Sequence, residues 1–538
     1  MNTTKYLSCL CFINLIFIVC SKDPIVKIQH GLIKGHQVSV LNKSVYEFIG
    51  IRYAKPPISD LRFKKPIPAG SWSGIYHATK KKCVCWQPTT EFRIEEMNED
   101  CLFLNIWSNG FKKLKPVFFW IHGGSFSIGS SFRKNLNGSA LATFDVVVVT
   151  INYRLGPFGF LYGANQDAPG NVGLYDQLLA LKWVKQNIKH FGGDPHQITL
   201  SGESAGSVSV GYHLLSDLSK GLFKRAIVMS GTPFYYKNYK GSNEKYLNFI
   251  KQFSNDLGCK TNDNLWIKCL KKQNASQLIN GKLSSAFTQT VFDDELYTET
   301  ALQTFQSGKF HSDVQILSGV MANEGTWFIW DYLPEFFGNP NSVVTKSELK
   351  LFIDILAIKM NFDSNKIYNF YIANKNQSDQ ISLKQSFADI IGDLVLLCPT
   401  HYFALEFAKL NNLLTNKIYF YKFSHKLQRY NNTNCPYDWM GYCHYEDVPI
   451  LFGQAVFESE IFTQEDYQFS LLIMKLWTNF VKNGDPLAGY SLSNINFNVN
   501  WPPFEFHNQV MELSRKNVGK LLTKPYDERC NFWKPYFY

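Results

Sequence analysis

The chain has 538 residues, of which 45% are hydrophobic, 18% are charged and 16% are aromatic. This is the composition of a globular protein with a large core, and it excludes a disordered or collagen-like chain. The net charge of +11 comes from 55 basic and 44 acidic residues, and the longest basic run is Lys80 to Lys82. Because no basic arm or tail is visible, we interpret the excess as solvated surface and expect no nucleic-acid partner.

The first 21 residues have the organisation of a secretory signal peptide. Lys5 precedes an apolar run from residue 6 to residue 20, which is the order and length of such signals. A membrane anchor is the competing interpretation, but the run is short, contains Asn14, and no second stretch of about 20 apolar residues follows. We therefore expect a secreted, extracellular protein without a membrane span.

Nine cysteines follow this segment, and export would allow them to persist as disulfides. Their number is odd, and spacing alone does not define their pairing. Five Asn-x-Ser/Thr sequons are candidate glycosylation sites in a secretory pathway. They are Asn42, Asn137, Asn274, Asn376 and Asn431.

The chain alternates apolar strands with helical segments. Residues 116–121 are apolar throughout, and residues 145–152, DVVVVTIN, contain four successive valines, as expected of strands covered on both faces. Residues 171–191 have helical spacing, and residues 223–230 supply a further strand. This alternation predicts an α/β fold with a mostly parallel sheet and helices on both faces.

The sequence FGGDPHQITLSGESAG occupies residues 191–206. Residues 198–200 predict a short buried strand, residues 202–206 a sharp turn, and residues 207–215 the start of a helix. Such a turn lifts the Ser204 hydroxyl clear of the sheet, and the glycines on either side allow the turn to close. The stretch therefore predicts a nucleophile elbow.

This stretch, with GIRYAKPP at residues 50–57 and NEDCLFLNIW at residues 98–107, resembles the type-B carboxylesterase and cholinesterase family. The resemblance extends from about Asp23 to Tyr538. It implies an α/β-hydrolase fold with a deep gorge, one catalytic domain over residues 22–538, and an ester substrate. The motifs supply nucleophile, base and electrophile, so we expect no metal or organic cofactor.

A serine nucleophile needs a histidine base and a carboxylate that holds the histidine. In this fold the chain order is nucleophile, acid, histidine. By resemblance the acid is Glu324, in LSGVMANEGT at the end of an apolar strand, and the base is His444, in GYCHYEDVPILFG. His425, in YKFSH, is the alternative base. Activity should fall as this histidine protonates, near its ordinary pKa of about 6.5 unless the site shifts it.

The segment WIHGGSF, residues 120–126, resembles the loop that forms the family's oxyanion hole. The resemblance implies that the backbone N–H groups of Gly124, Ser125 and Ala205 stabilise the negative charge of the tetrahedral intermediate. Ser125 stands where cholinesterases have a third glycine. Only its N–H group is needed, so we expect function to survive this replacement.

Further positions follow the resemblance. Glu203 is similar to the acidic residue with which cholinesterases favour cationic substrates, and Ser230 to a serine that hydrogen-bonds the triad acid. Trp327 and Phe328 align with aromatic residues of the gorge. Ala286 and Thr288 align with the acyl pocket, where acetyl-selective enzymes carry phenylalanine, so a larger acyl group should fit.

Choline esters need an aromatic face for the quaternary ammonium. In cholinesterases a tryptophan within a disulfide-closed loop provides it. The corresponding loop, closed here by Cys85 and Cys101, is short, and its Trp86 is out of register. The sequence therefore favours a general carboxylesterase. Action on choline esters is the second hypothesis.

A non-catalytic adhesion or ligand-binding protein of the same family is the third hypothesis, and the retained Ser204, Glu324 and His444 argue against it.

The resemblance also implies disulfides. Cys435 and Cys443 lie close enough in sequence to form another, and Cys83 either replaces Cys85 or stays free. The implied pairs are Cys85–Cys101, Cys259–Cys269 and Cys398–Cys530.

Overall fold

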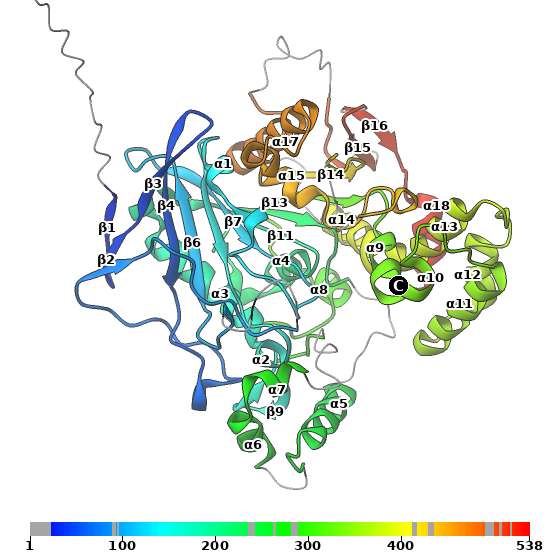
Figure 1. Cartoon of the computed structure of the whole chain (residues 1–538), viewed down its shortest axis with the longest axis horizontal. Coiled ribbons are helices and arrows are strands. Elements are labelled where there is room, and N and C mark those ends of the chain that lie inside the picture. The colour runs from blue at the N-terminus through cyan, green and yellow to red at the C-terminus, as the bar shows by residue number, and fades with distance from the viewer. Residues whose placement is uncertain are drawn as a thin grey trace, which may run out of the picture.

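The computed structural model describes residues 23–88, 93, 96–234, 243–261, 265–280, 289–410, 417–428, 435–489, 500–504, 508–516 and 519–538. The predicted signal peptide, residues 1–21, lies outside this part of the chain. A sheet of 11 strands crosses the molecule, in the order β16-β15-β14-β13-β12-β11-β7-β8-β6-β4-β3 (Figure 1).

The sheet strands are β3 His36–Val40, β4 Lys43–Arg52, β6 Phe103–Ser108, β7 Lys115–Ile121, β8 Val147–Ile151, β11 Gly193–Glu203, β12 Arg225–Met229, β13 Gln315–Met321, β14 Ile418–Phe423, β15 Gln509–Leu513 and β16 Lys520–Thr523. The strands from β8 to β15 pair in parallel. Antiparallel pairs join β8, β6, β4 and β3 at one edge, and β15 and β16 at the other. The predicted mostly parallel sheet is confirmed, with antiparallel edges.

Alternate residues of β7 belong to two different cores. Val117, Phe119 and Ile121 pack into the core that also includes residues of α3 (Val172–Asn187) and α4 (Ala205–Leu215). Phe118 and Trp120 pack with α1 (Ser139–Ala142) and α17 (Gln464–Asn483) on the other face. This two-sided burial explains why the strand is apolar at successive positions.

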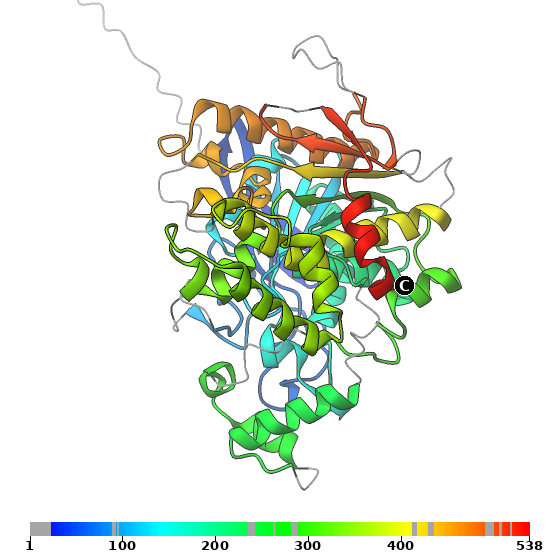
Figure 2. The same ribbon diagram turned by 90° about the vertical axis from the view of Figure 1, so that its right-hand side faces the viewer.

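Further helices project from the sheet in two groups, one around α5 to α7 and one around α9 to α13 (Figures 1 and 2). The C-terminal helix α18 contacts α14, which follows the second group in the chain. The remaining helices are α2 Gly156–Phe160, α5 Asn243–Asp256, α6 Trp266–Lys272, α7 Ala275–Asn280, α8 Ala301–Ser307, α9 Gly325–Tyr332, α10 Pro334–Phe337, α11 Lys346–Met360, α12 Ser364–Tyr371, α13 Gln380–Gly392, α14 Cys398–Leu410, α15 Asp447–Leu451, α16 Gln454–Phe457 and α18 Asp527–Phe537. Short strands outside the main sheet are β1 Ile25–Ile28, β2 Gly31–Lys34, β5 Ile75–His77, β9 Tyr162–Asn165 and β10 Ala168–Pro169.

Four disulfides connect the described residues. They include the three pairs that the resemblance implied and the additional pair suggested by sequence proximity, whereas Cys83 is not bridged to another described cysteine. The cross-links agree with an oxidising compartment. The bonds are Cys85–Cys101, Cys259–Cys269, Cys398–Cys530 and Cys435–Cys443.

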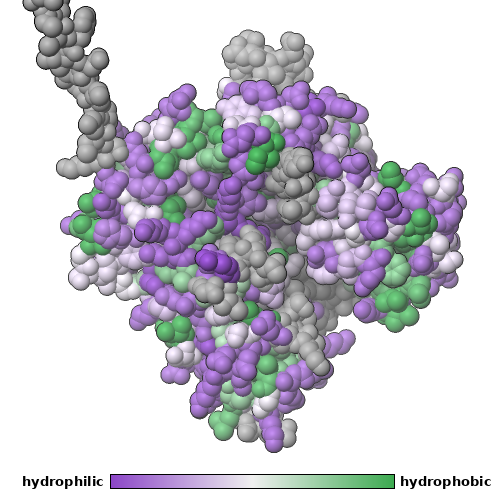
Figure 3. Space-filling view, viewed as in Figure 1, coloured by the Kyte–Doolittle hydropathy of each residue, from purple (hydrophilic) through white to green (hydrophobic). Residues whose placement is uncertain are grey.

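Within the described residues, one continuous helical run, Gln380–Lys409, is long and apolar enough to cross a membrane. Its most apolar window is 83% buried inside the protein, as expected of a core helix. On the face drawn in Figure 3, hydrophilic residues predominate and hydrophobic residues lie in small separate groups.

Three of the sequon asparagines, Asn42, Asn274 and Asn376, are exposed. Asn137 is half-buried, and its Oδ1 accepts a hydrogen bond from the backbone N–H of Ser139 at 2.9 Å. Asn431 lies outside the described residues. Glycosylation at these positions stays a prediction.

Candidate active site

Ser204 stands between strand β11 and helix α4, as predicted. Its backbone has φ 56° and ψ −125°, a conformation that non-glycine residues seldom adopt. A Cβ atom added to Gly206 would lie 2.1 Å from the carbonyl oxygen of Ile121, so only glycine fits there. The helix begins at Ala205, two residues earlier than predicted, because the turn is complete at Ser204.

The loop after β7 approaches Ser204 closely. Its residues Gly124, Ser125 and Phe126 have φ values of 109°, 52° and 58°. This run of left-handed conformations turns backbone groups toward the elbow. Within the described chain, the N–H groups of Gly124, Ser125 and Ala205 donate to no protein acceptor. Three free N–H groups beside a serine could bind an oxyanion.

Glu324 and His444 meet although 120 residues separate them in sequence. Nδ1 of His444 lies 2.7 Å from Oε2 of Glu324, and both residues are buried. The other carboxylate oxygen of Glu324 accepts a hydrogen bond from the backbone N–H of Met321 at 2.7 Å. The carboxylate is therefore held from two sides, and it orients the imidazole.

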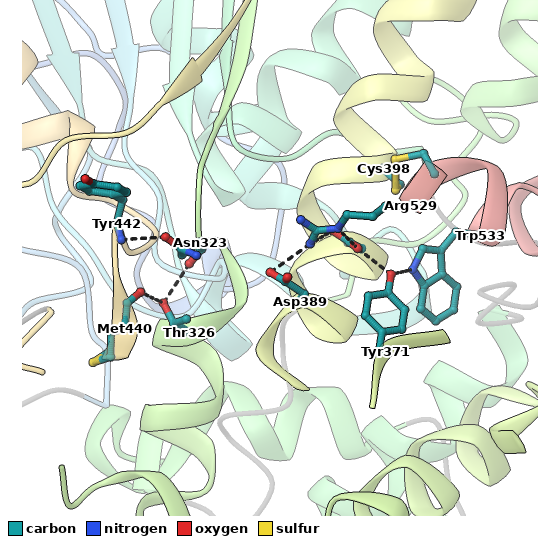
Figure 4. A network of polar contacts seen from close by, with 11 residues as sticks. Asn323, Thr326, Tyr371, Asp389, Cys398, Met440, Tyr442, Arg529 and Trp533 are labelled. Carbon is teal, nitrogen blue, oxygen red and sulfur yellow. Dashed lines mark hydrogen bonds and ion pairs between the residues drawn. A yellow bond between two sulfur atoms is a disulfide. The ribbon is translucent and has the colours of Figure 1, made fainter. Parts of the chain in front are cut away.

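The two loops that carry this pair are also joined to each other (Figure 4). Oδ1 of Asn323 accepts a hydrogen bond from the backbone N–H of Tyr442 at 3.0 Å, and the N–H of Asn323 donates to the carbonyl of Tyr442 at 3.1 Å. The hydroxyl of Thr326 donates to the carbonyl oxygen of Met440 at 2.8 Å. The residues flanking Glu324 thus fix the backbone on the N-terminal side of His444.

Nε2 of His444 faces a second carboxylate. It lies 3.1 Å from Oε1 of Glu203, which is buried directly before Ser204. Among the residues that the structure describes, Nε2 has no aligned hydrogen-bond partner, and Ser204 does not hydrogen-bond to it. The structure therefore joins His444 to both glutamates but leaves the serine hydroxyl apart.

Burial and charge act in opposite directions on these groups. Burial lowers the pKa of His444, but the charges of Glu203 and Glu324 and the hydrogen bond that the imidazole donates to Glu324 outweigh it and raise this pKa to about 9. Burial raises the pKa of Glu203 to about 7. Asp447, three residues after the histidine, is fully buried, and burial holds its pKa well above the ordinary value. Asp447 was not among the site residues predicted from the sequence, although it lies within the histidine motif.

A cavity of about 270 Å³ exposes Ser204 to ligands. Its described lining is aliphatic and aromatic, with a few hydroxyls, and contains no charged side chain. The lining comprises Ser125, Phe126, Ser204, Ala205, Val208, Thr232, Phe328, Tyr332, Met360, Leu394, Val395, Leu396 and Pro399. Sequence reasoning had identified Ser125, Ser204, Ala205 and Phe328 among these residues.

The other predicted substrate-binding residues have different positions. Phe328 lines the cavity, and its ring lies 5.3 Å from the imidazole of His444. Trp327, its neighbour on α9, is not among the described lining residues, because successive residues of a helix face different directions. Glu203 lies beneath the surface. Ala286 and Thr288 lie outside the described residues.

Trp86 lines a separate small cavity together with the Cys85–Cys101 disulfide, and not the cavity of Ser204. The alternative base His425 pairs with Asp466 at 3.2 Å, whereas Glu324 pairs with His444. The hydroxyl of Ser230 has no hydrogen-bond partner in the described chain. The suggestion that it bonds Glu324 was therefore wrong, because the N–H of Met321 occupies that position.

A parallel sheet with covering helices, a serine elbow between strand and helix, and an acid and a histidine later in the chain define an α/β-hydrolase. The chain belongs to the carboxylesterase family, whose profile matches residues 22–533. Membership places it among the serine carboxylic-ester hydrolases, which include cholinesterases.

Relatives cover almost the whole chain. It is 33% identical to "Acetylcholinesterase-1" of Trittame loki, over 96% of this chain and 94% of that protein. It is 35% identical to "Cholinesterase" of Mus musculus, over 96% and 87%. It is 32% identical to "Acetylcholinesterase" of Bungarus fasciatus, over 94% and 85%.

Proposed function

We propose that the protein is a secreted serine carboxylesterase that hydrolyses neutral short- or medium-chain esters. The observation that carries this assignment is the buried 2.7 Å contact between His444 and Glu324 beside a cavity that exposes Ser204. Deprotonating a serine hydroxyl requires such a base with a carboxylate partner.

In the first half of the reaction, Oγ of Ser204 attacks the ester carbonyl carbon and His444 takes the hydroxyl proton. The carbonyl electron pair moves onto oxygen, where the N–H groups of Gly124, Ser125 and Ala205 stabilise it. The intermediate then breaks its bond to the alcohol oxygen. The alcohol leaves with the proton from His444, and the acyl group stays on Ser204.

In the second half, His444 takes a proton from a water molecule, which attacks the acyl carbon. The bond to Ser204 breaks, the serine regains its proton from His444, and the carboxylic acid leaves. Because Ser204 and His444 are not hydrogen-bonded in this structure, the serine hydroxyl must turn toward Nε2 when substrate binds. Catalytic hydrogen bonds often tighten only at that stage.

Neutral esters fit the site better than choline esters. The described lining of the cavity holds no charged group, and Trp86 lies in another cavity. A quaternary ammonium binds best on the face of an indole, and the rings of the described lining are those of Phe126, Phe328 and Tyr332. Choline esters are the second candidate, since the relatives are named cholinesterases and Glu203 lies beside His444.

Secretion is supported by the four disulfides and by the apolar segment at residues 1–21. Expression of the full chain in a eukaryotic cell should deliver the protein to the medium. N-terminal sequencing should then show that the first 21 or so residues are absent. Retention of the intact N-terminus in a membrane fraction would contradict this part of the proposal.

The enzymatic test compares a neutral butyrate ester with acetylthiocholine. The unmodified protein should hydrolyse the butyrate ester with the higher kcat/KM, and the Ser204→Ala variant should be inactive. Ser209→Ala is the matched control, because Ser209 lies on the same helix but does not line the cavity, and its hydroxyl accepts a hydrogen bond from Gln177 and donates one to the carbonyl of Ala205. A protein inert on both esters would refute the proposal, and a preference for acetylthiocholine would favour the second candidate.

A further inference from the structure

One wall of the cavity is built from an unusual helical turn. Residues Asp393–Leu397, labelled η7, form a π-helix between α13 and α14. Leu394, Val395 and Leu396 from this turn line the cavity that exposes Ser204. Such π-turns often occur at functional sites. The position of this turn therefore determines how much room a bound ester has.

The N-terminal end of the π-turn is held by the C-terminal helix α18. Nε of Arg529 donates to Oδ2 of Asp393 at 2.6 Å, and its Nη2 donates to the other oxygen of the same carboxylate. Nη2 also pairs with Asp389 at 3.0 Å (Figure 4). Asp393 is fully buried. The bidentate guanidinium fixes the orientation of this carboxylate and also compensates its negative charge.

Two further contacts orient the same group. The hydroxyl of Tyr371 donates to Oδ2 of Asp393 at 2.6 Å, and the indole N–H of Trp533 donates to that hydroxyl at 2.7 Å. Trp533 lies on α18, one turn after Arg529. The C-terminal helix therefore reaches Asp393 both directly and through Tyr371.

The other end of the turn is fixed independently. The disulfide between Cys398 and Cys530 joins the residue directly after the turn, which is the first residue of α14, to α18. The hydroxyl of Thr232 donates to the carbonyl of Pro399 at 2.8 Å, and Thr400 accepts a hydrogen bond from the N–H of Gly231 at 3.0 Å. The three lining residues thus lie between two anchored ends.

We infer that Arg529 is a positioning residue for the proposed esterase, and that it sets the acyl-chain selectivity by holding the π-turn against the bound ester. Arg529 does not line the described cavity, so it acts through Asp393. The Asp393 carboxylate is fully buried and the Arg529 side chain is 28% exposed. An ion pair that takes a carboxylate out of water often adds little net stability compared with apolar residues of the same volume. We therefore assign this pair the function of holding the cavity wall, residues 394–396, in one arrangement, and not that of stabilising the fold. The inference rests on the proposed function.

The test uses Arg529→Lys, which keeps the positive charge but loses the bidentate hydrogen bonding to the carboxylate. We would measure kcat and KM for the p-nitrophenyl esters of acetate, butyrate and octanoate. The wall should recede, and the octanoate to acetate ratio of kcat/KM should rise about tenfold, comparable to the effect of one methylene of misfit. The change should appear mainly in KM for octanoate.

The matched control is Arg154→Lys. Nε and Nη2 of Arg154 bond the buried carboxylate of Asp176 at 2.8 and 2.7 Å, and neither residue lines the described cavity. This variant should lower Tm and leave the ratio unchanged. If Arg529→Lys does not fold, as judged by circular dichroism, Tyr371→Phe replaces it, since it removes one donor from the same carboxylate.

Equal loss of Tm in the two lysine variants, with an unchanged ratio in both, would overturn the inference and leave the proposed function intact. An unchanged ratio in a folded Tyr371→Phe variant, used in its place, would do the same. An unmodified protein inert on all three esters would overturn the proposed function and the inference together.

Discussion

Nε2 of His444 lies 3.1 Å from Oε1 of Glu203. The ring nitrogen that must accept the proton of Ser204 therefore points at a buried carboxylate. Neither group is exposed to solvent that could screen the attraction. The pair has a direct consequence for the pH range in which the histidine can accept a proton.

Hydrolysis should rise with pH through an apparent pKa above the ordinary histidine value of about 6.5. The carboxylates stabilise the protonated imidazole, and only its neutral form accepts the serine proton. Glu203→Gln removes one of these charges, so the rise should move to lower pH. The measurement is kcat/KM against pH for a neutral ester.

Glu47→Gln is the control for this experiment. Glu47 is also a buried carboxylate, but it contacts His36 and Trp107 on the edge strands. This variant should keep the pH profile of the unmodified protein. A profile that Glu203→Gln does not displace would show that Glu203 does not influence the base.

Glu324→Gln should lower kcat by roughly 10³ to 10⁴ while the fold is retained. An amide at this position no longer stabilises the imidazolium, and it can favour the wrong tautomer. Asp466→Asn is the control, because Asp466 also pairs a carboxylate with a histidine, His425, but neither residue lines the cavity of Ser204. It should reduce Tm with little effect on kcat. Similar kcat values for the two variants would argue against Glu324 as the acid.

Gly123→Ala should reduce kcat about 100-fold, the effect expected of a displacement of about 1 Å at the reacting groups. An added Cβ would lie 2.5 Å from Oε2 of Glu203 and 3.0 Å from Cβ of Ser204. Gly70→Ala is the control, since nothing lies within 4 Å of an added Cβ there. Full activity of Gly123→Ala would show that the loop after β7 can retreat from the elbow.

Replacing Cys398 and Cys530 together by alanine should cost more stability than replacing Cys435 and Cys443. The first bond closes a loop of 132 residues and the second a loop of 8. On loop-closure entropy alone the losses are about 5 and about 2.5 kcal/mol. Urea unfolding of both double variants checks the order. The reverse order would mean that native contacts around the shorter loop dominate.

Much of this architecture could be predicted because its signals are local. The apolar strands at residues 116–121 and 145–152, and the elbow at Ser204, carry their own patterns, and the structure confirms them. The α/β-hydrolase fold follows from those patterns together with the family resemblance. The absence of Trp327 from the described cavity lining could not be predicted, because it depends on the orientation of α9, which sequence spacing does not define.

The π-turn at residues 393–397 could not be predicted in this way. Its sequence, DLVLL, continues an apolar helix, and helical periodicity does not distinguish the two forms. Its anchor, Arg529, lies 136 residues from Asp393 in sequence. Likewise Asp447 reads as one more acidic residue in a motif until its burial is known.

The contacts of Asn323 and Thr326 with the histidine loop make the acid and the base one mechanical unit. A displacement of either loop therefore acts on the other, which preserves the contact between Glu324 and His444. The separation between the Ser204 hydroxyl and the imidazole is the part of the triad that this coupling does not fix. Binding of an ester must bring these two groups together.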